Sequence, residues 1–466
     1  MIRKMKPMLL FLMSLLMIFV VACSGNNGGS GSSPSPSNGG GSGENDGDGS
    51  LPQVTIQYWV DPRFQFVEGL EDQTPNYGDW EKIQAQKFMD MHPHVNIEVQ
   101  ALTWEDMGTR VPISITSGSP PDVLRDYLGR TAQYAHQGVL ENLEDYIPQE
   151  ELDDYLPDYL EMYTINGHLH ALPAYAWISA MVVNRALWEQ QGAADLLPNS
   201  DDPTWSFDQL DEAIRAINAP NVFPLGVQIA TSQGDNGLLG WFWGHGAQFF
   251  KDGDYSKTAL NSPEAVAALE RLKQYNDEGL LQPSAVTAAN GDLETYLYQG
   301  QLGIFAGQTQ GIWSMLENAQ KEGRVAGEHE LQMVKQPDVD GVESGVLVGP
   351  TSLAVFKQED DYKREWVIEF VRFLNSTEYQ KEYAINAGQF PTRISAQLED
   401  LPEESRVAQE LMAKYGAEDN GLTTPHFAEL RVLLQPMVQS VILGQKTPEE
   451  ALAEYESEAN RILSGE

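Results

Sequence analysis

Ten tryptophans are the residues whose type and position most restrict the chemistry of this chain. Five of them fall in predicted helices or at the end of a predicted strand, and we expect these in the core. The other five stand in predicted loops or strand ends, beside Gly, Pro or polar residues: Trp104, Trp177, Trp241, Trp243 and Trp313. An indole presents a flat face on which the C–H face of a sugar ring can stack, while the hydroxyls of the sugar need Asp, Asn, Arg or Tyr partners. Together these five favour a carbohydrate-binding surface, although each one alone could equally pack against a neighbouring element.

Motifs of catalysis are absent from the sequence. There is no Gly-x-Ser-x-Gly elbow, no glycine-rich phosphate loop ending in Lys-Ser/Thr, and no His-Glu-x-x-His. A glycosidase needs two carboxylates on either side of one sugar bond. With 68 acidic residues in the chain, every spacing occurs by chance. We therefore predict no catalytic residues and no enzymatic activity, and keep a surface carbohydrate-active enzyme as the weaker alternative.

Two His-x-His pairs are the only sequence pattern that suggests a metal. His92 with His94, and His168 with His170, have a spacing that directs two imidazoles to one side of a strand. The first pair, however, brackets a proline at the junction of two elements, and the second follows an Asn-Gly turn. We favour ordinary surface or turn histidines, and expect neither a metal site nor a cofactor.

The elements that would position these residues alternate between strand and helix. Apolar residues recur with period 2 over 54–60 and 95–99, which predicts strands, and with near-helical spacing over 79–92. Ser206, Ser262 and Thr447 stand where N-caps begin three more helices, and the runs 303–306 and 347–350 predict further strands. This alternation indicates α/β architecture with a largely parallel sheet. Residues 51–466 are enough for two such lobes.

The N-terminal region predicts export and lipidation. Basic residues precede an apolar run, residues 8–21, that is too short to cross the hydrocarbon core of about 30 Å, so 1–22 reads as a signal peptide. The run Val21-Ala22-Cys23 resembles a bacterial lipobox, which implies lipidation of Cys23, the only cysteine. The rest of 23–50 is rich in Gly and Ser without hydrophobic side chains, and predicts a disordered linker. We expect a chain anchored at the outer face of the cell membrane.

The charge of the chain excludes some partners. A formal net charge of −39 at pH 7 disfavours nucleic acid, which is bound through cation–phosphate contacts. It also disfavours docking on anionic membrane surfaces. Solubility and mutual repulsion are a sufficient reason for such a charge, and we expect a monomer.

Several segments, taken in order, resemble family 1 extracellular solute-binding proteins, which include maltodextrin- and multiple-sugar-binding proteins. They are SGSPPDV (117–123), ALP (171–173), VNRAL (183–187), TWSFDQL (204–210), QGQLGI (299–304), GIW (311–313), EWVIEFVRFL (365–374) and GQFPTR (388–393). The resemblance implies an α/β, two-lobe fold of the periplasmic-binding-protein type (type II). Such a fold has mixed sheets flanked by helices, three inter-lobe crossings and a ligand cleft between the lobes. It implies lobe 1 at 51–173 plus 346–400, and lobe 2 at 174–345 plus 401–466.

The resemblance also implies a function and a set of site residues. The chain would capture a carbohydrate, most simply an oligosaccharide, and deliver it to the permease subunits of an ABC importer. The residues carried over to the cleft are Asp61, Arg63, Trp104, Asp126, Arg130, Tyr175, Trp177, Trp241, Trp243 and Trp313. Asp126 and Arg431 stand where maltodextrin binders have aromatics, so another sugar is expected. Arg63 and Arg130 would suit an acidic sugar, or could pair with carboxylates of the chain. Ferric iron, a polyamine or an organic anion are the alternative solutes.

Overall fold

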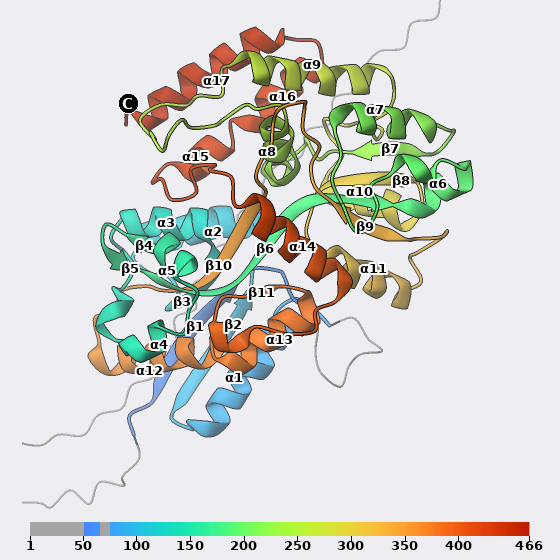
Figure 1. Cartoon of the computed structure of the whole chain (residues 1–466). Helices are drawn as coiled ribbons and strands as arrows, with labels where there is room; N and C mark the ends of the chain where they lie inside the picture. Colours follow the sequence, from blue (N-terminus) through green and yellow to red (C-terminus); the bar gives the residue numbers. More distant parts are fainter. Residues whose placement is uncertain (1–50, 66–74, 466) are drawn as a thin grey trace, which may run out of the picture. The chain divides into compact units, whose positions relative to one another are not determined.

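A nine-stranded mixed sheet organises the computed structural model, which describes residues 51–65 and 75–465 (Figure 1). The strand order is β2-β1-β3-β10-β6-β8-β7, and β9 and β11 also pair with β6. The strands are β1 Val54–Val60, β2 Val95–Ala101, β3 Val123–Tyr127, β6 Ala171–Asn184, β7 Phe223–Gly226, β8 Leu302–Gln308, β9 Leu331–Val334, β10 Leu347–Val355 and β11 Phe390–Pro391. A separate hairpin joins β4 (Thr164–Ile165) to β5 (His168–Leu169). The predictions for the signal peptide, Cys23 and the linker fall outside the described residues.

The pairing of the strands is mixed. Only β1 with β2 and β3, and β7 with β8, are parallel, and all other pairs of the large sheet are antiparallel. The mixed α/β fold is therefore confirmed, whereas the expectation of a largely parallel sheet is wrong. The reason is that the antiparallel strands β6 and β10 lie in the middle of the sheet, between the two sets of parallel strands.

Strand β6 is fourteen residues long and is buried along its whole length. Small, apolar and aromatic side chains make up nearly all of it, as is expected for a strand covered on both faces. Residues up to Ser179 pair with β10 and β11, and residues from Ala180 onward pair with β8 and β9. Figure 1 shows β6 passing from one group of strands to the other. One strand thus belongs to both groups.

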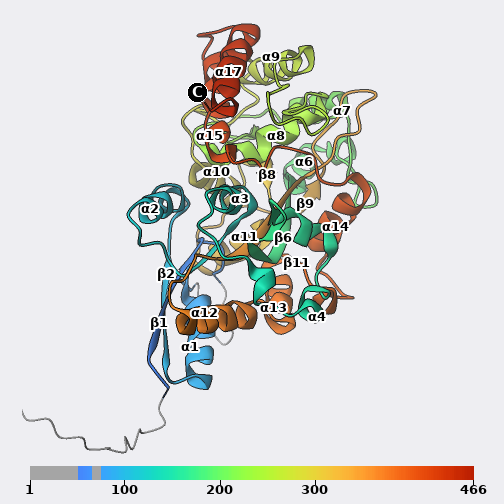
Figure 2. The same ribbon diagram turned by 90° about the vertical axis from the view of Figure 1, so that its left-hand side faces the viewer.

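Helices cover both groups of strands. Helix α1 (Asp79–Met91) packs on β2, and α12 (Asp361–Leu374) packs on β1 and β10; Figure 2 shows the two helices side by side. Helices α8 (Asp235–Gly244) and α10 (Asn290–Tyr298) pack on β8. The other helices of eight or more residues are α2 Trp104–Thr116, α3 Leu128–His136, α7 Phe207–Ala216, α9 Pro263–Asp277, α11 Ile312–Lys321, α13 Thr377–Ala387, α14 Glu403–Tyr415, α16 Leu434–Ile442 and α17 Pro448–Leu463. Shorter helices are α4 Gln149–Leu152, α5 Pro157–Met162, α6 Arg185–Gln191 and α15 Phe427–Arg431.

The three predicted N-caps are confirmed. Ser206 and Thr447 form complete capping boxes at the starts of α7 and α17, and the Ser262 side chain accepts a hydrogen bond from the backbone of Ala265 at the start of α9. A side-chain oxygen at this position satisfies a backbone N–H that would otherwise lack a partner. Within the described ranges, no helix combines the length and apolar character that spanning a lipid bilayer would need.

Candidate ligand-binding site

Two adjoining cavities lie at the ends of several strands. The first, named here the Trp177 cavity, measures about 220 Å³, and its walls include Trp177, Tyr127, Asp235, Phe427, Arg431 and β10 from Leu347 to Pro350. The second, the Trp313 cavity, measures about 980 Å³, and its walls include Trp313, Phe64, Tyr77, Glu294 and Gln389. Both are lined by Arg63, Trp104, Asn290 and Thr309. Because they share these walls, the two cavities form one candidate site.

The carboxyl ends of strands supply much of the Trp177 cavity. Arg63 follows β1, Tyr127 ends β3, Gln228 follows β7, and Gln308 ends β8. In open α/β sheets, ligands bind in crevices outside the carboxyl ends of the strands. The carboxyl ends that line the cavity belong to both groups of strands, so one ligand there could contact residues of both groups.

Arg63 is held among three aromatic rings. Its Nε donates to Oδ2 of Asp61 at 2.9 Å. Its guanidinium carbon lies 5.0, 5.8 and 5.6 Å from the ring centres of Trp104, Tyr175 and Trp177. A guanidinium at such distances is attracted to the ring faces. Arg63 therefore has a defined position at the junction of the two cavities.

Asp61 supports Arg63 and does not line either cavity. Its other oxygen accepts a hydrogen bond from Nε of Arg125 at 2.6 Å, and Arg125 in turn donates to Glu81 at 2.5 Å. Arg125 and Glu81 are completely buried. Burial would raise the pKa of Asp61, but the guanidiniums of Arg125 and Arg63 hold it below its ordinary value. In this structure both Asp61 oxygens are thus occupied by arginines, and Asp61 positions Arg63 without lining a cavity.

Asp126 and Arg130 satisfy each other. Nε and Nη2 of Arg130 each donate to one Asp126 oxygen at 2.6 Å, which is the bidentate geometry that suits a guanidinium and a carboxylate. Both side chains are buried, and neither lines a cavity. The prediction that these two residues contact ligand is not supported, because their hydrogen-bonding groups face each other.

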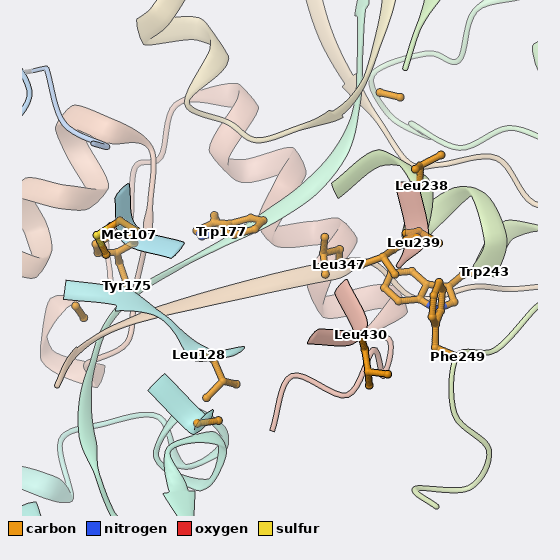
Figure 3. Packing of buried hydrophobic residues seen from close by; sticks show 14 of the residues in the cluster. Met107, Leu128, Tyr175, Trp177, Leu238, Leu239, Trp243, Phe249, Leu347 and Leu430 are labelled. Carbon is orange, nitrogen blue, oxygen red and sulfur yellow. The ribbon is translucent and has the colours of Figure 1, made fainter. Parts of the chain in front are cut away.

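Tyr175 and Trp177 share one face of β6, as Figure 3 shows, but at different depths. Trp177 lines the Trp177 cavity. Tyr175 is fully buried below it, between the rings of Phe64 and Tyr383, at 5.5 and 5.1 Å between centroids. Tyr175 therefore forms part of the support beneath Arg63 and does not reach the cavity in this structure.

The resemblance placed Trp241 and Trp243 approximately at a ligand-facing loop, and the structure has a helix there instead of a loop. Both belong to α8 and are 1% and 2% exposed. The indole N–H of Trp241 donates to the carbonyl of Ala268 at 2.9 Å, and Figure 3 shows Trp243 beside Phe249 and apart from Trp177. The glycines of this segment suggested a loop, since glycine disfavours helix interiors. Here they allow close packing: a Cβ at Gly244 would lie 2.0 Å from the carbonyl oxygen of Pro337.

Trp104 and Trp313 stand at the beginnings of helices, where loops had been predicted. Trp104 is the first residue of α2 and lines both cavities, and the half-buried Trp313 is the second residue of α11 and lines the Trp313 cavity. Of the ten residues predicted for the cleft, the cavities bring together Arg63, Trp104, Trp177 and Trp313. These four remain the proposed ligand contacts from the sequence prediction.

Six amide side chains of the Trp177 cavity were not anticipated. They are Gln228, Gln233, Asn236, Asn290, Gln308 and Asn420. Within the part of the chain that the structure describes, no hydrogen bond occupies the side-chain amides of Asn236, Gln308 and Asn420. Gln228 and Gln308 could have been found by looking for polar residues immediately after or at the end of strands. The other four come from helices and connections whose approach to the sheet has no local sequence signal.

Arg431 crosses the Trp177 cavity to the end of β3. It forms a two-point ion pair with Asp235, donating from Nη2 to Oδ1 at 2.9 Å and also from Nε to Oδ2. Its Nη1 donates to the Tyr127 hydroxyl at 3.2 Å, and Nη2 also donates to Gln233 at 3.3 Å. All three guanidinium nitrogens of Arg431 are therefore occupied by the protein.

Glu294 is the carboxylate of the Trp313 cavity with the most perturbed acidity. Burial raises its pKa to about 7, against the opposing effects of Arg324 and of the hydrogen bond from the Asn290 side chain. Asn290 lines both cavities and donates one amide N–H to Glu294, so its second N–H and its carbonyl oxygen remain for a ligand. Among the described residues, no group of three or more His, Cys, Asp or Glu side chains is arranged to hold a metal ion.

Residues 71–381 match the model of a family described as bacterial extracellular solute-binding protein. This chain belongs to that family. A binding protein of Brucella abortus (strain 2308) is 21% identical over 384 residues, which are 80% of this chain and 87% of that protein. A maltotriose-binding protein of Pyrococcus abyssi is 27% identical over 140 residues, 29% of this chain and 27% of that protein. The fold is similar to an ABC transporter solute-binding protein of Thermotoga lettingae bound with alpha-D-tagatose, with a TM-score of 0.73, 20% identity, and coverage of 88% of this chain and 100% of that one.

Proposed function

We propose that this solute-binding protein captures a carbohydrate, most simply an oligosaccharide, and delivers it to the permease subunits of an ABC importer. The observation that carries the proposal is the composition of the Trp177 cavity, which is lined by Trp104, Trp177 and six residues with amide side chains. Indoles stack on the C–H faces of sugar rings. An amide offers both a donor and an acceptor, which matches a hydroxyl that also does both.

The names of two similar proteins point in the same direction. The relative from Pyrococcus abyssi is a maltotriose-binding protein, and the Thermotoga lettingae structure holds alpha-D-tagatose. The connection of the Trp177 cavity to the larger Trp313 cavity supports a ligand of more than one sugar unit, with the second indole platform at Trp313. The proposal does not extend to hydrolysis, since the family is one of binding proteins.

Two of the alternative solutes have less support. Ferric iron needs clustered oxygen and nitrogen ligands, and the described residues contain no such group of His, Cys, Asp or Glu. A polyamine needs carboxylates that are free to pair with it, and in the Trp177 cavity, where the two indoles lie, the one carboxylate, Asp235, is already paired with Arg431. An organic anion remains the alternative to be tested beside sugars.

We further propose the predicted architecture around this site. Lobe 1 comprises 51–173 plus 346–400, and lobe 2 comprises 174–345 plus 401–466. The change of partners along β6, between Ser179 and Ala180, supports a division near this strand. Closure of the lobes on a ligand would exclude water from the cavities. The chain would act as a monomer, tethered to the outer face of the membrane by a lipid on Cys23.

A thermal-shift screen tests the proposed function. The purified protein is heated with neutral mono- and oligosaccharides, with citrate, with spermidine and with ferric citrate, and positive results are repeated by calorimetry. A ligand that binds only the folded state adds about 2.7 kcal/mol of stability at one hundred times its Kd. Stabilisation by at least one sugar supports the proposal. Stabilisation by citrate, spermidine or iron, with no response to any sugar, would refute it.

A further inference from the structure

One guanidinium in the site has its two terminal nitrogens available. Arg63 uses only Nε, on Asp61, and the hydrogen bonds of the described residues include none from its Nη1 or Nη2. Its side chain is 14% exposed, at the wall that the two cavities share. A guanidinium presents its N–H groups as a planar fork that fits two oxygens of one anionic group. Arg63 thus offers an unoccupied fork to whatever fills the cavities.

The neighbouring arginines do not offer the same opportunity. Arg130 is bound at two points by Asp126, and Arg431 is bound by Asp235, Tyr127 and Gln233. Arg63 shares its single carboxylate, Asp61, with the buried Arg125. Two guanidiniums therefore flank one carboxylate, and of these two only Arg63 reaches the cavities.

Trp177 lies beside this fork and lines the same cavity, with its ring centre 5.6 Å from the guanidinium carbon of Arg63. Its indole N–H is buried and has no hydrogen-bond partner among the described residues. The N–H groups of a guanidinium and of an indole can only donate. A sugar hydroxyl would accept one of these bonds but would need an acceptor for its own hydrogen. A carboxylate, phosphate or sulfate group accepts only, and so matches the two terminal nitrogens of Arg63, which only donate.

The carboxylates that line the two cavities are Asp235, which is paired with Arg431, and Glu294, Glu317 and Glu404 of the Trp313 cavity. Glu294 lines the Trp313 cavity and receives the Asn290 N–H. Because burial raises its pKa to about 7, its negative charge is weakened near neutral pH. It would therefore repel an anion beside Arg63 less than an ordinary carboxylate would.

We propose that the carbohydrate recognised by this protein carries an anionic group, and that this group binds the Nη1 and Nη2 of Arg63 at the wall shared by the two cavities. The amide side chains of the Trp177 cavity then take the hydroxyls. This inference rests on the proposed carbohydrate function. It names the class of ligand, an acidic sugar, and names Arg63 as the residue that binds its charged group.

Calorimetry with matched sugars tests the inference on the intact protein. The pairs are glucuronic acid with glucose and digalacturonic acid with galactobiose, and glucose 6-phosphate distinguishes a phosphate from a carboxylate. We expect an acidic member to bind more tightly than its neutral counterpart. Arg63→Gln should reduce that preference roughly 10- to 100-fold, the value of hydrogen bonds to a charged group. Arg63→Lys, which retains the charge but loses the fork, should recover only part of it.

Arg110→Gln is the matched control. Arg110 is partly exposed on α2 and lies outside both cavities; it forms an ion pair with Asp106 at 4.0 Å and lies 5.4 Å from the ring centre of Trp59. Arg110→Gln removes the same charge as Arg63→Gln but does so outside the cavities. This control should therefore leave the preference for the acidic sugar unchanged. If neutral sugars bind as well as or better than their acidic partners, or if Arg63→Gln weakens both members equally, the inference is wrong while the carbohydrate function stands. If citrate binds and no sugar does, both fail.

Discussion

The indole of Trp177 lies directly against the backbone of Gly349, its partner across the β6–β10 pair. A Cβ at Gly349 would stand only 2.0 Å from Cζ2 of the indole. An aromatic ring can occupy this position only because its cross-strand neighbour has no side chain. The absence of a side chain at Gly349 therefore determines where the Trp177 ring lies in the cavity wall.

Gly349→Ala should displace Trp177. Overpacking of this kind costs about 1–3 kcal/mol of stability, and the moved ring should also weaken ligand binding. Chemical denaturation and calorimetry measure the two effects. Gly108→Ala is the control, because a Cβ there meets nothing within 4 Å inside α2. It should stabilise the protein by up to about 1 kcal/mol. Equal behaviour of the two variants would show that the contact has no role in the site.

Replacing Trp177, Trp313 or Trp243 with alanine should affect ligand affinity and folding stability to different extents. Trp177→Ala removes a ring that is 8% exposed and lines the cavity, so it should cost about 3–5 kcal/mol of stability and about 2 kcal/mol or more of affinity. The half-buried Trp313 should cost less stability for a similar loss of affinity. Trp243→Ala should destabilise without changing the affinity of the folded fraction. Denaturation midpoints and calorimetric affinities are measured on all three, and normal affinity in both Trp177→Ala and Trp313→Ala would contradict the proposed contacts.

Glu294 should make stability depend on pH in a defined direction. Its pKa is about 7 in the folded chain, above the ordinary value of 4.5. Between these values the folded state keeps a proton that the unfolded state releases, so this group lowers the free energy of unfolding as the pH rises. Glu294→Gln should remove the effect, and its gain in stability over wild type should be larger at pH 8 than at pH 4 by on the order of 2 kcal/mol. A difference that does not change with pH would contradict the assignment.

Arg431 and Asp235 should show the behaviour of a buried ion pair. Their side chains are 10% and 7% exposed. Arg431→Met leaves Asp235 without its cation and should cost about 3–5 kcal/mol, measured by denaturation. Replacing both, as Arg431→Met with Asp235→Leu, should restore most of the loss because no unpaired charge remains. If the double variant is as unstable as the single one, the ion pair is not the cause.

Cys23 should determine where the protein resides in the cell. Cys23→Ala should prevent lipidation and move the protein out of the membrane fraction, which immunoblotting of fractions and intact mass spectrometry would measure. A protein that stays in the membrane, with no acyl mass on the wild type, would exclude the anchor.

Local signals in the sequence were sufficient for much of the fold. The strand β1 and the helices α7, α9 and α17 were predicted from their periodicity and capping residues, which act within a few positions of the chain. The helix α8 was missed because its glycines are unfavourable for an isolated helix. They are tolerated where Gly240 and Gly244 approach the chain at Gln336 and Pro337.

The site was harder to predict because its residues depend on distant partners. Asp61 has the right type and position for a ligand contact, but Arg125, sixty-four positions away, takes one of its oxygens. The ion pair between Asp126 and Arg130 could have been predicted, since the two residues lie four positions apart on adjoining elements. The family resemblance instead led to the prediction that both contact a ligand in the cleft. Arg431 was noted as unusual, and only the approach of α15 to β3 reveals its contact with Tyr127.

The shared strand β6 has a consequence for how the chain acquires its structure. Its first part pairs with β10 and β11, which follow it by well over one hundred residues, so the strand remains incomplete until most of the chain has been made. Contacts so distant in sequence slow folding, because the loop between them must be ordered before they form. A polypeptide truncated before Leu347 would leave an apolar strand edge uncovered, and such edges recruit other chains. The geometry that joins the two groups of strands thus also makes the growing chain prone to aggregation until its last third is available.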